Sequence, residues 1–107
     1  MTKKILTTKF NYRMPTGELK KIMPVAAHGF AEIPGCTWKI WLINEEHKEA
    51  GGVYLFESDM ALDQFLNSHL LTSVTSNPDF SNFRADTFDV EEQPSLITRG
   101  PLVKMQP

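Results

Sequence analysis

The sequence predicts an α+β domain in which helices cover one face of a four-stranded antiparallel sheet. Four segments alternate side chains with the two-residue period of strands, and two others repeat apolar residues at helical spacing. The segments follow one another as strand, helix, strand, strand, helix, strand. A chain of 107 residues is long enough for one domain of this kind. We therefore expect residues 1–107 to form a single domain.

The first half of the chain opens with a strand over residues 4–12, whose even-numbered side chains from Leu6 to Tyr12 share one face. A helix is predicted over 16–33, because apolar residues recur there at i, i+3, i+4 and i+7. Pro24 lies inside this helix and removes a backbone donor. We expect it to produce a kink or a late helix start.

The centre of the chain reads as a hairpin. Strands are predicted over 36–43 and 50–57, and the polar residues 44–49 between them form the loop. Alternation places Trp38 on one face of the first strand and Trp41 on the other, so the two indoles are not neighbours.

The second hairpin strand carries Tyr54 and Phe56 on one face. It also contains Gly51 and Gly52, which have no side chain to pack and weaken a strand by entropy. The pair predicts either a bulge or a point where another group approaches the backbone closely.

A second helix is predicted from Ser58 or Asp59, either of which can cap it, to about Leu71. Phe65 and His69 lie on its apolar stripe. After this helix the sequence predicts a loop and then a final strand.

The last third of the chain is expected to be loop-like over 72–82, where turn-forming residues are frequent. Residues 83–90 alternate well enough to form the fourth strand. Residues 91–107 contain three prolines, and we expect a C-terminal tail without regular structure that wraps a surface or a partner.

This order of elements is the βαββαβ arrangement of ferredoxin-like domains, whose helices pack on one sheet face. The other face stays uncovered and carries Tyr12, Trp41 or Phe88, depending on register. Because a large exposed apolar patch marks an interface, we expect a homodimer joined through the sheet face.

Composition argues against several partners and locations. The net charge of −2 gives no electrostatic bias towards nucleic acid or an anionic membrane. No apolar run approaches the roughly 20 residues that span a bilayer, and no signal-peptide core follows Met1. Cys36 is the single cysteine, so an intrachain disulfide is excluded. These features predict a cytoplasmic protein that binds neither nucleic acid nor membrane.

Several motifs resemble those of the YdhR-type mono-oxygenases, small proteins of the dimeric α/β-barrel class related to antibiotic-biosynthesis mono-oxygenases. The resemblance covers nearly the whole chain. Its most specific parts are the PG at 34–35, the W-K-x-W pattern of Trp38, Lys39 and Trp41, and EAGGVYLF at 49–56. Weaker support comes from Pro24, from FDV at 88–90 and from Pro94.

The resemblance implies a cofactor-independent mono-oxygenase that uses dioxygen on a small planar aromatic substrate, held in a pocket between the sheet and the helices. Such a reaction needs an apolar pocket, an acid or base, and donors for developing oxyanions. The glycines lack the G-x-G-x-x-G order of dinucleotide sites, and the three histidines lack metal-ligand spacing. We therefore expect no cofactor and no metal.

Within that implied site, His69 and Tyr54 are the candidate catalytic residues, with His69 as the base. The candidate substrate-binding residues are Trp38, Trp41, Phe56, Phe65 and Asn11. Each has an ordinary structural interpretation as well, because strand aromatics commonly fill cores and a histidine near a helix C-terminus is favoured by the dipole.

Two other functions remain open. A dimeric protein could use the same pocket to bind or sense a small hydrophobic ligand without any reaction. Haem breakdown, which occurs in related barrels, would need a histidine at an open pocket, and His69 is the candidate for that role.

Overall fold

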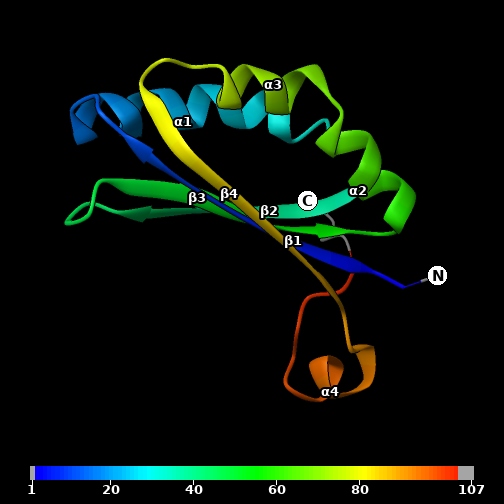
Figure 1. Ribbon diagram of the computed structural model, residues 1–107. Coiled ribbons are helices and arrows are strands. Elements are labelled where there is room, and N and C mark those ends of the chain that lie inside the picture. The colour runs from blue at the N-terminus through cyan, green and yellow to red at the C-terminus, as the bar shows by residue number, and fades with distance from the viewer. Residues whose placement is uncertain (1, 104–107) are drawn as a thin grey trace.

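The computed structural model describes residues 2–103; Met1 and residues 104–107 of the expected tail lie outside the described residues. One antiparallel sheet runs in the order β2-β3-β1-β4. Its strands are β1 (Lys4–Tyr12), β2 (Cys36–Asn44), β3 (Glu49–Phe56) and β4 (Phe80–Asp89). The helices are α1 (Thr16–Phe30), α2 (Asp59–Leu66), α3 (His69–Thr75) and α4 (Glu92–Ile97). Helices α1, α2 and α3 lie on one side of the sheet and α4 on the other, which confirms the ferredoxin-like prediction (Figure 1).

Helix α1 is continuous through Pro24 and begins at Thr16, so the predicted late start is wrong. It also ends at Phe30, short of the predicted residue 33. Its buried residues are Leu19, near the start, and Phe30, at the end. The middle of α1 therefore lies over the sheet but does not pack tightly against it.

The turns around the hairpin follow the sequence closely. Gly35 has a φ of +75°, and a Cβ there would lie 2.4 Å from the Cβ of Ala61. Glycine is required on both counts. In β3 the register with β1 runs unbroken through Gly51 and Gly52, so the pair marks a close approach and not a bulge. A Cβ on Gly51 would lie 1.8 Å from the Thr8 carbonyl oxygen.

The predicted single helix up to about Leu71 is wrong, because the chain breaks at Asn67 and starts a new helix. The Ser68 hydroxyl accepts a hydrogen bond from the Leu71 N–H at 3.3 Å, which caps α3. Serine is a preferred N-cap, so its position inside the predicted helix is the physical reason for the break.

The predicted loop over 72–82 is too long at both ends, since α3 continues to Thr75 and β4 begins at Phe80. Hydroxyl groups inside α3 donate to the helix's own carbonyl oxygens, for example Ser73 to Leu70 at 2.6 Å. These bonds let a sequence rich in serine and threonine remain helical.

The expected irregular tail contains α4, which the prolines do not prevent. Pro94 lies in the first turn of this helix, where its missing N–H would have no helical partner. Beyond α4 the chain returns to the sheet. There the Trp38 indole N–H donates to the Pro101 carbonyl oxygen at 2.7 Å, and Leu102 is buried.

The main core lies between the sheet and the helices, where Leu6, Phe56 and Phe65 are buried together. The opposite sheet face is covered in part by the returning tail. Ile40 and Phe88 on that face remain about half exposed. No helix among residues 2–103 is both long and apolar enough to cross a membrane.

Candidate functional site

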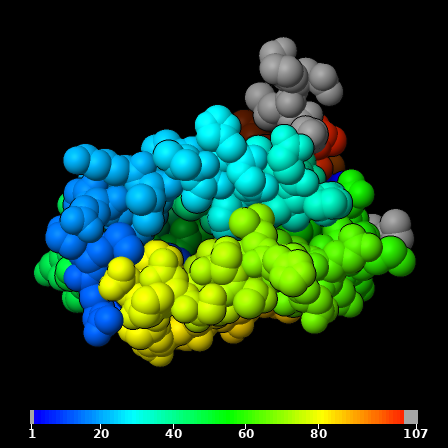
Figure 2. Space-filling view, turned by 90° about the horizontal axis from the view of Figure 1, so that it is seen from above, coloured from blue at the N-terminus to red at the C-terminus, as the bar shows by residue number. Residues whose placement is uncertain are grey.

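A cavity of about 90 Å³ lies between the sheet and the middle of α1, under the part of the helix that is not buried. Most of the residues that line it are apolar. It is lined by Thr8, Phe10, Leu19, Ile22, Met23, Ala26, Phe30, Lys39, Trp41, Gly51, Tyr54, Leu71, Val74, Phe80 and Phe83. Seen from the helical side, the surface is hollowed between α1 and α3, and the sheet is visible below (Figure 2).

The amine of Lys39 is enclosed by aromatic rings. Its Nζ lies 3.5 Å from the ring centroid of Phe30 and 3.5 Å from that of Trp41. The ring of Tyr54, its cross-strand partner, is 4.8 Å away. Ring faces within about 6 Å attract an ammonium through their quadrupole. The amine therefore has a preferred position inside the cavity.

Burial dominates the charge state of this amine. Loss of hydration lowers the pKa of Lys39 from its usual 10.5 to about 7, and a thiolate at Cys36 would act in the opposite direction. Among residues 2–103, Lys39 forms no ion pair with a carboxylate that would offset burial. Near neutral pH a large share of Lys39 is therefore a free amine.

Gly52 makes room for the lysine stem. A Cβ on Gly52 would lie 2.7 Å from Lys39 Cε. The Gly52 N–H donates to the Thr8 hydroxyl at 3.1 Å, which fixes that hydroxyl at the cavity floor. Gly52 thus leaves space for Lys39 on β2, and Gly51 allows the close pairing of β3 with β1.

Tyr54 supplies a hydroxyl that stays protonated. Burial raises the pKa of Tyr54 well above its ordinary value, and a hydrogen bond with the Thr8 side chain opposes this only in part. Its phenol therefore stays protonated near neutral pH and can donate a hydrogen bond to an anion.

Four of the predicted site residues lie in the cavity wall or directly behind it. Trp41 and Tyr54 both line the cavity. Phe56 and Phe65 lie behind Tyr54 in the core, with ring centroids 6.0 and 5.1 Å from that of Tyr54. They support the cavity wall without forming it.

Two other predicted residues lie outside the cavity. Trp38 is on the opposite sheet face, where its indole contacts the returning tail. His69 is the first residue of α3, and its side chain is exposed. The structure therefore does not bring the proposed base to the aromatic rings.

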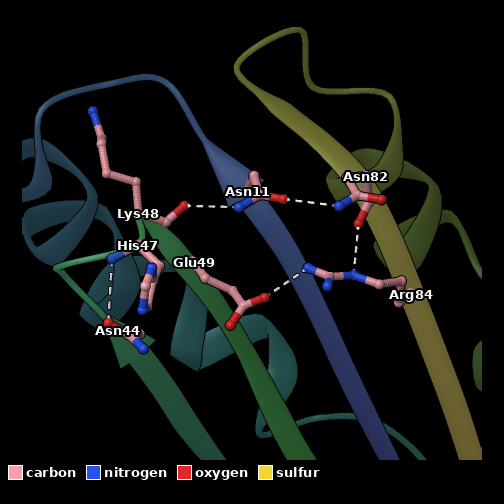
Figure 3. A network of polar contacts seen from close by, with 7 residues as sticks. All are labelled: Asn11, Asn44, His47, Lys48, Glu49, Asn82 and Arg84. Atoms are coloured by element: carbon pink, nitrogen blue, oxygen red, sulfur yellow. Dashed lines mark hydrogen bonds and ion pairs between the residues drawn. The ribbon is translucent and has the colours of Figure 1, made fainter.

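Asn11 also faces away from the cavity and belongs to a polar network that spans β1, β3 and β4 (Figure 3). Its side chain accepts a hydrogen bond from Asn82 at 3.0 Å and donates to the Lys48 carbonyl at 3.5 Å. Arg84 pairs with Glu49 at 2.7 Å beside it. The register shift between β1 and β4 lies next to Asn11.

Lys39 was not among the predicted site residues, although the sequence contains two signals for it. Alternation along W-K-x-W puts Lys39 on the same face as Trp41. Gly52, in the neighbouring strand, leaves space for a long side chain. Together these signals mark a lysine on the Trp41 face with space for its side chain, and the structure shows that the helices cover this face.

Metal-ligating residues are dispersed. Within the described range 2–103, no three histidine, cysteine or acidic side chains come together as the ligands of a metal ion would.

Comparison with known proteins agrees with the fold. A family model described as "Putative mono-oxygenase ydhR" matches residues 5–101. No curated protein matches the chain significantly.

Several solved structures share the architecture. SnoaB, a cofactor-independent oxygenase from Streptomyces nogalater, is 15% identical over 87% of this chain and 97% of its own, with a TM-score of 0.68. NE2512, of unknown function, from Nitrosomonas europaea is 16% identical over 85% and 91%, with a TM-score of 0.72. Rv0793 from Mycobacterium tuberculosis is 14% identical over 85% and 97%, at 0.66. At these identities the likeness concerns the fold.

Proposed function

The chain belongs to the ydhR family, whose model is described as "Putative mono-oxygenase ydhR", and on this premise we propose that it is a cofactor-independent mono-oxygenase for a small planar aromatic substrate. The observation that carries the proposal is the cavity under α1, with ring faces on several sides and few polar side chains among them. Apolar walls with a few convergent polar groups are typical of small-molecule sites. SnoaB, which shares the fold, is a cofactor-independent oxygenase, and this supports the same class of reaction here.

The reaction needs no external reductant if the substrate supplies all the electrons. A phenol can become a quinone with one molecule of dioxygen: one oxygen atom forms the new carbonyl, and the other leaves as water with the two hydrogens removed from the substrate. Tyr54 is the proposed donor that stabilises negative charge on the reacting oxygens. Trp41 and Phe30 are proposed to bind the substrate ring.

Cavity size limits the substrate. A cavity of about 90 Å³ is smaller than an engineered one of roughly 150 Å³ that holds benzene. Even a single ring therefore needs the cavity to widen. Ile22 and Ala26 are exposed at the mouth and leave room for this movement. We propose a one-ring phenol in preference to a polycyclic compound.

The second part of the proposal is a homodimer through the open sheet face. Ile40 on β2 and Phe88 on β4 are 52% and 56% exposed there. A second copy covering this face would remove both side chains from water without touching the cavity on the other face.

Oxygen uptake by metal-stripped protein, with a panel of one-ring phenols, tests the activity. Ala26→Phe fills the cavity mouth, whereas Val25→Phe adds the same ring at a position that is 73% exposed and does not line the cavity. We expect uptake without added cofactor, lost in Ala26→Phe and kept in Val25→Phe. Binding without uptake across the panel would instead favour the ligand-binding alternative.

A further inference from the structure

We propose that Lys39 is the catalytic base of this site: its Nζ takes the proton of an acidic phenol bound in the cavity and, as an ammonium, holds the phenolate beside the rings of Phe30 and Trp41. This inference rests on the proposed function. It adds two details that the proposed function leaves open, namely the residue that acts as the base and the acidity of the phenol. The substrate class is a phenol whose hydroxyl is acidic enough to ionise near neutral pH.

The position of the amine suits this role. The Lys39 Nζ lies 3.5 Å from two ring centroids and itself covers those ring faces, so a planar substrate that contacts the edges of the two rings brings its hydroxyl within reach of the amine. The methylene chain of Lys39 lies over Gly52, where a side chain would clash with it. The amine is thus pre-positioned on a strand, and strands hold a site more rigidly than loops.

No other side chain that lines the cavity can accept the proton. Tyr54, the other titratable residue of the lining, is held protonated by burial, as the upward shift of its pKa shows. The lining residues from α1, α3, β1 and β4 have no titratable side chain. Cys36 lies on β2 outside the lining, and burial raises the pKa of its thiol.

The charge of the amine also fits a proton acceptor. Burial lowers the pKa of Lys39 to about 7, so a large share of the amine is uncharged near neutral pH and can accept a proton there. Once protonated, it needs an anion, and no carboxylate among residues 2–103 pairs with it. The substrate oxygen supplies that anion in the product of the transfer.

The step is a plain proton transfer. The substrate O–H bond breaks, an N–H bond forms at Nζ, and the electron pair of the broken bond stays on the phenolate oxygen. No electron leaves the substrate in this step. The later transfer of electrons from the phenolate to dioxygen belongs to the oxygenase reaction.

A coloured phenol tests whether the site holds the phenolate beside Lys39, without any turnover. 4-Nitrophenol changes its absorption from the near ultraviolet to the visible on ionisation, and 4-nitroanisole is its methyl ether without the proton. At slightly acidic pH, where the free probe is mostly neutral, we expect wild-type protein to bind 4-nitrophenol with the phenolate band. Lys39→Met should bind both probes but show no phenolate band.

The outcomes separate the two proposals. If both probes bind to wild type and the nitrophenol stays neutral, the role of Lys39 is overturned while the cavity remains a ligand site. If neither probe binds, the proposed function fails and the role of Lys39 fails with it.

Lys39→Arg separates proton transfer from charge attraction, because an arginine stays protonated at these pH values. It should keep the phenolate band, yet its oxygen uptake with phenols should fall about 100-fold, as in Lys39→Met. Wild-type uptake in Lys39→Arg would overturn the assignment of Lys39 as a base.

Discussion

Folding places the Lys39 amine where its charged form loses most of its water and gains ring faces in return. Cation–π contacts contribute about 0.5–2 kcal/mol, whereas burying an unpaired charge costs several. The free-energy cost of burying the charged amine therefore exceeds the gain from the ring contacts, and this lowers the pKa of Lys39. A buried lysine whose pKa is perturbed in a cavity is a common mark of a functional site.

This cost makes stability depend on pH. The pKa of Lys39 is about 7 in the folded protein against an ordinary 10.5, so between these values the unfolded chain binds more protons and stability rises with pH. Lys39→Met removes the group. We expect it to be more stable than wild type at pH 6, by a margin that shrinks by about 3 kcal/mol on going to pH 9.

Urea unfolding of both proteins at the two pH values measures that margin. A margin that stays constant between pH 6 and pH 9 would mean that Lys39 is hydrated and charged in the folded protein.

The two neighbouring glycines should differ in their tolerance of a methyl group. In Gly51→Ala the new Cβ meets the Thr8 backbone oxygen at 1.8 Å, which only strand separation can relieve. In Gly52→Ala it meets Lys39 Cε, part of a flexible side chain, at 2.7 Å. We expect a loss of about 4 kcal/mol or more for Gly51→Ala and about 1–2 kcal/mol for Gly52→Ala, measured by denaturant unfolding.

A second readout makes the pair informative about the site. Gly52→Ala should displace the amine and weaken the phenolate band of bound 4-nitrophenol. Equal stability losses at both glycines would contradict the expected difference between a backbone clash and a side-chain clash.

Trp41 and Tyr54, two of the predicted site residues, line the cavity, but the sequence could not show which face of β2 the helices cover. The two faces of that strand each carry a tryptophan, and the predicted substrate-binding residues included both Trp38 and Trp41. Lys39 shares the face of Trp41 and became recognisable only once that face was known.

Among the elements, the returning tail depends on one indole. Trp38 donates to the Pro101 carbonyl and lies on the sheet face away from the cavity. Trp38→Phe loses this hydrogen bond, so we expect a loss of about 1 kcal/mol and a melting temperature lower by a few degrees. Its affinity for 4-nitroanisole should be unchanged.

Trp41→Phe is the matched control for that prediction, because it alters the cavity wall by the same substitution. Calorimetric melting together with probe titration compares the two variants. A loss of affinity in Trp38→Phe, with its melting temperature intact, would place Trp38 in the ligand site instead.

The strands and the first helix follow from periodicity, and the sequence predicted them nearly to their ends. The errors lie where short polar side chains decide the outcome. Ser68 caps a new helix inside what periodicity treats as one, and the hydroxyls of α3 bond to its own carbonyls. Composition alone cannot distinguish such a helix from a loop, since the same residues favour turns.

In the whole molecule, one face of the sheet forms the cavity and the other is the proposed dimer interface. One face holds the cavity under α1, and the other presents Ile40 and Phe88 beside the tail. Ile40→Glu places a charge in the proposed dimer interface, so we expect dimer in wild type and monomer in the variant by sedimentation.

Val25→Glu is the control for this comparison, because Val25 is an exposed apolar residue on α1, on the helical side of the sheet. It should sediment as wild type does. Wild-type protein that is monomeric at high concentration would contradict the proposed interface.

The most direct test of the proposed oxygenase activity is the fate of labelled dioxygen. Metal-stripped protein is given ¹⁸O₂ and a one-ring phenol that binds the cavity, and the product is analysed by mass spectrometry. We expect one labelled oxygen atom per quinone, with the second in water, and no requirement for flavin or metal. Product without label, or label that enters only after a cofactor is added, would contradict a cofactor-independent mono-oxygenase.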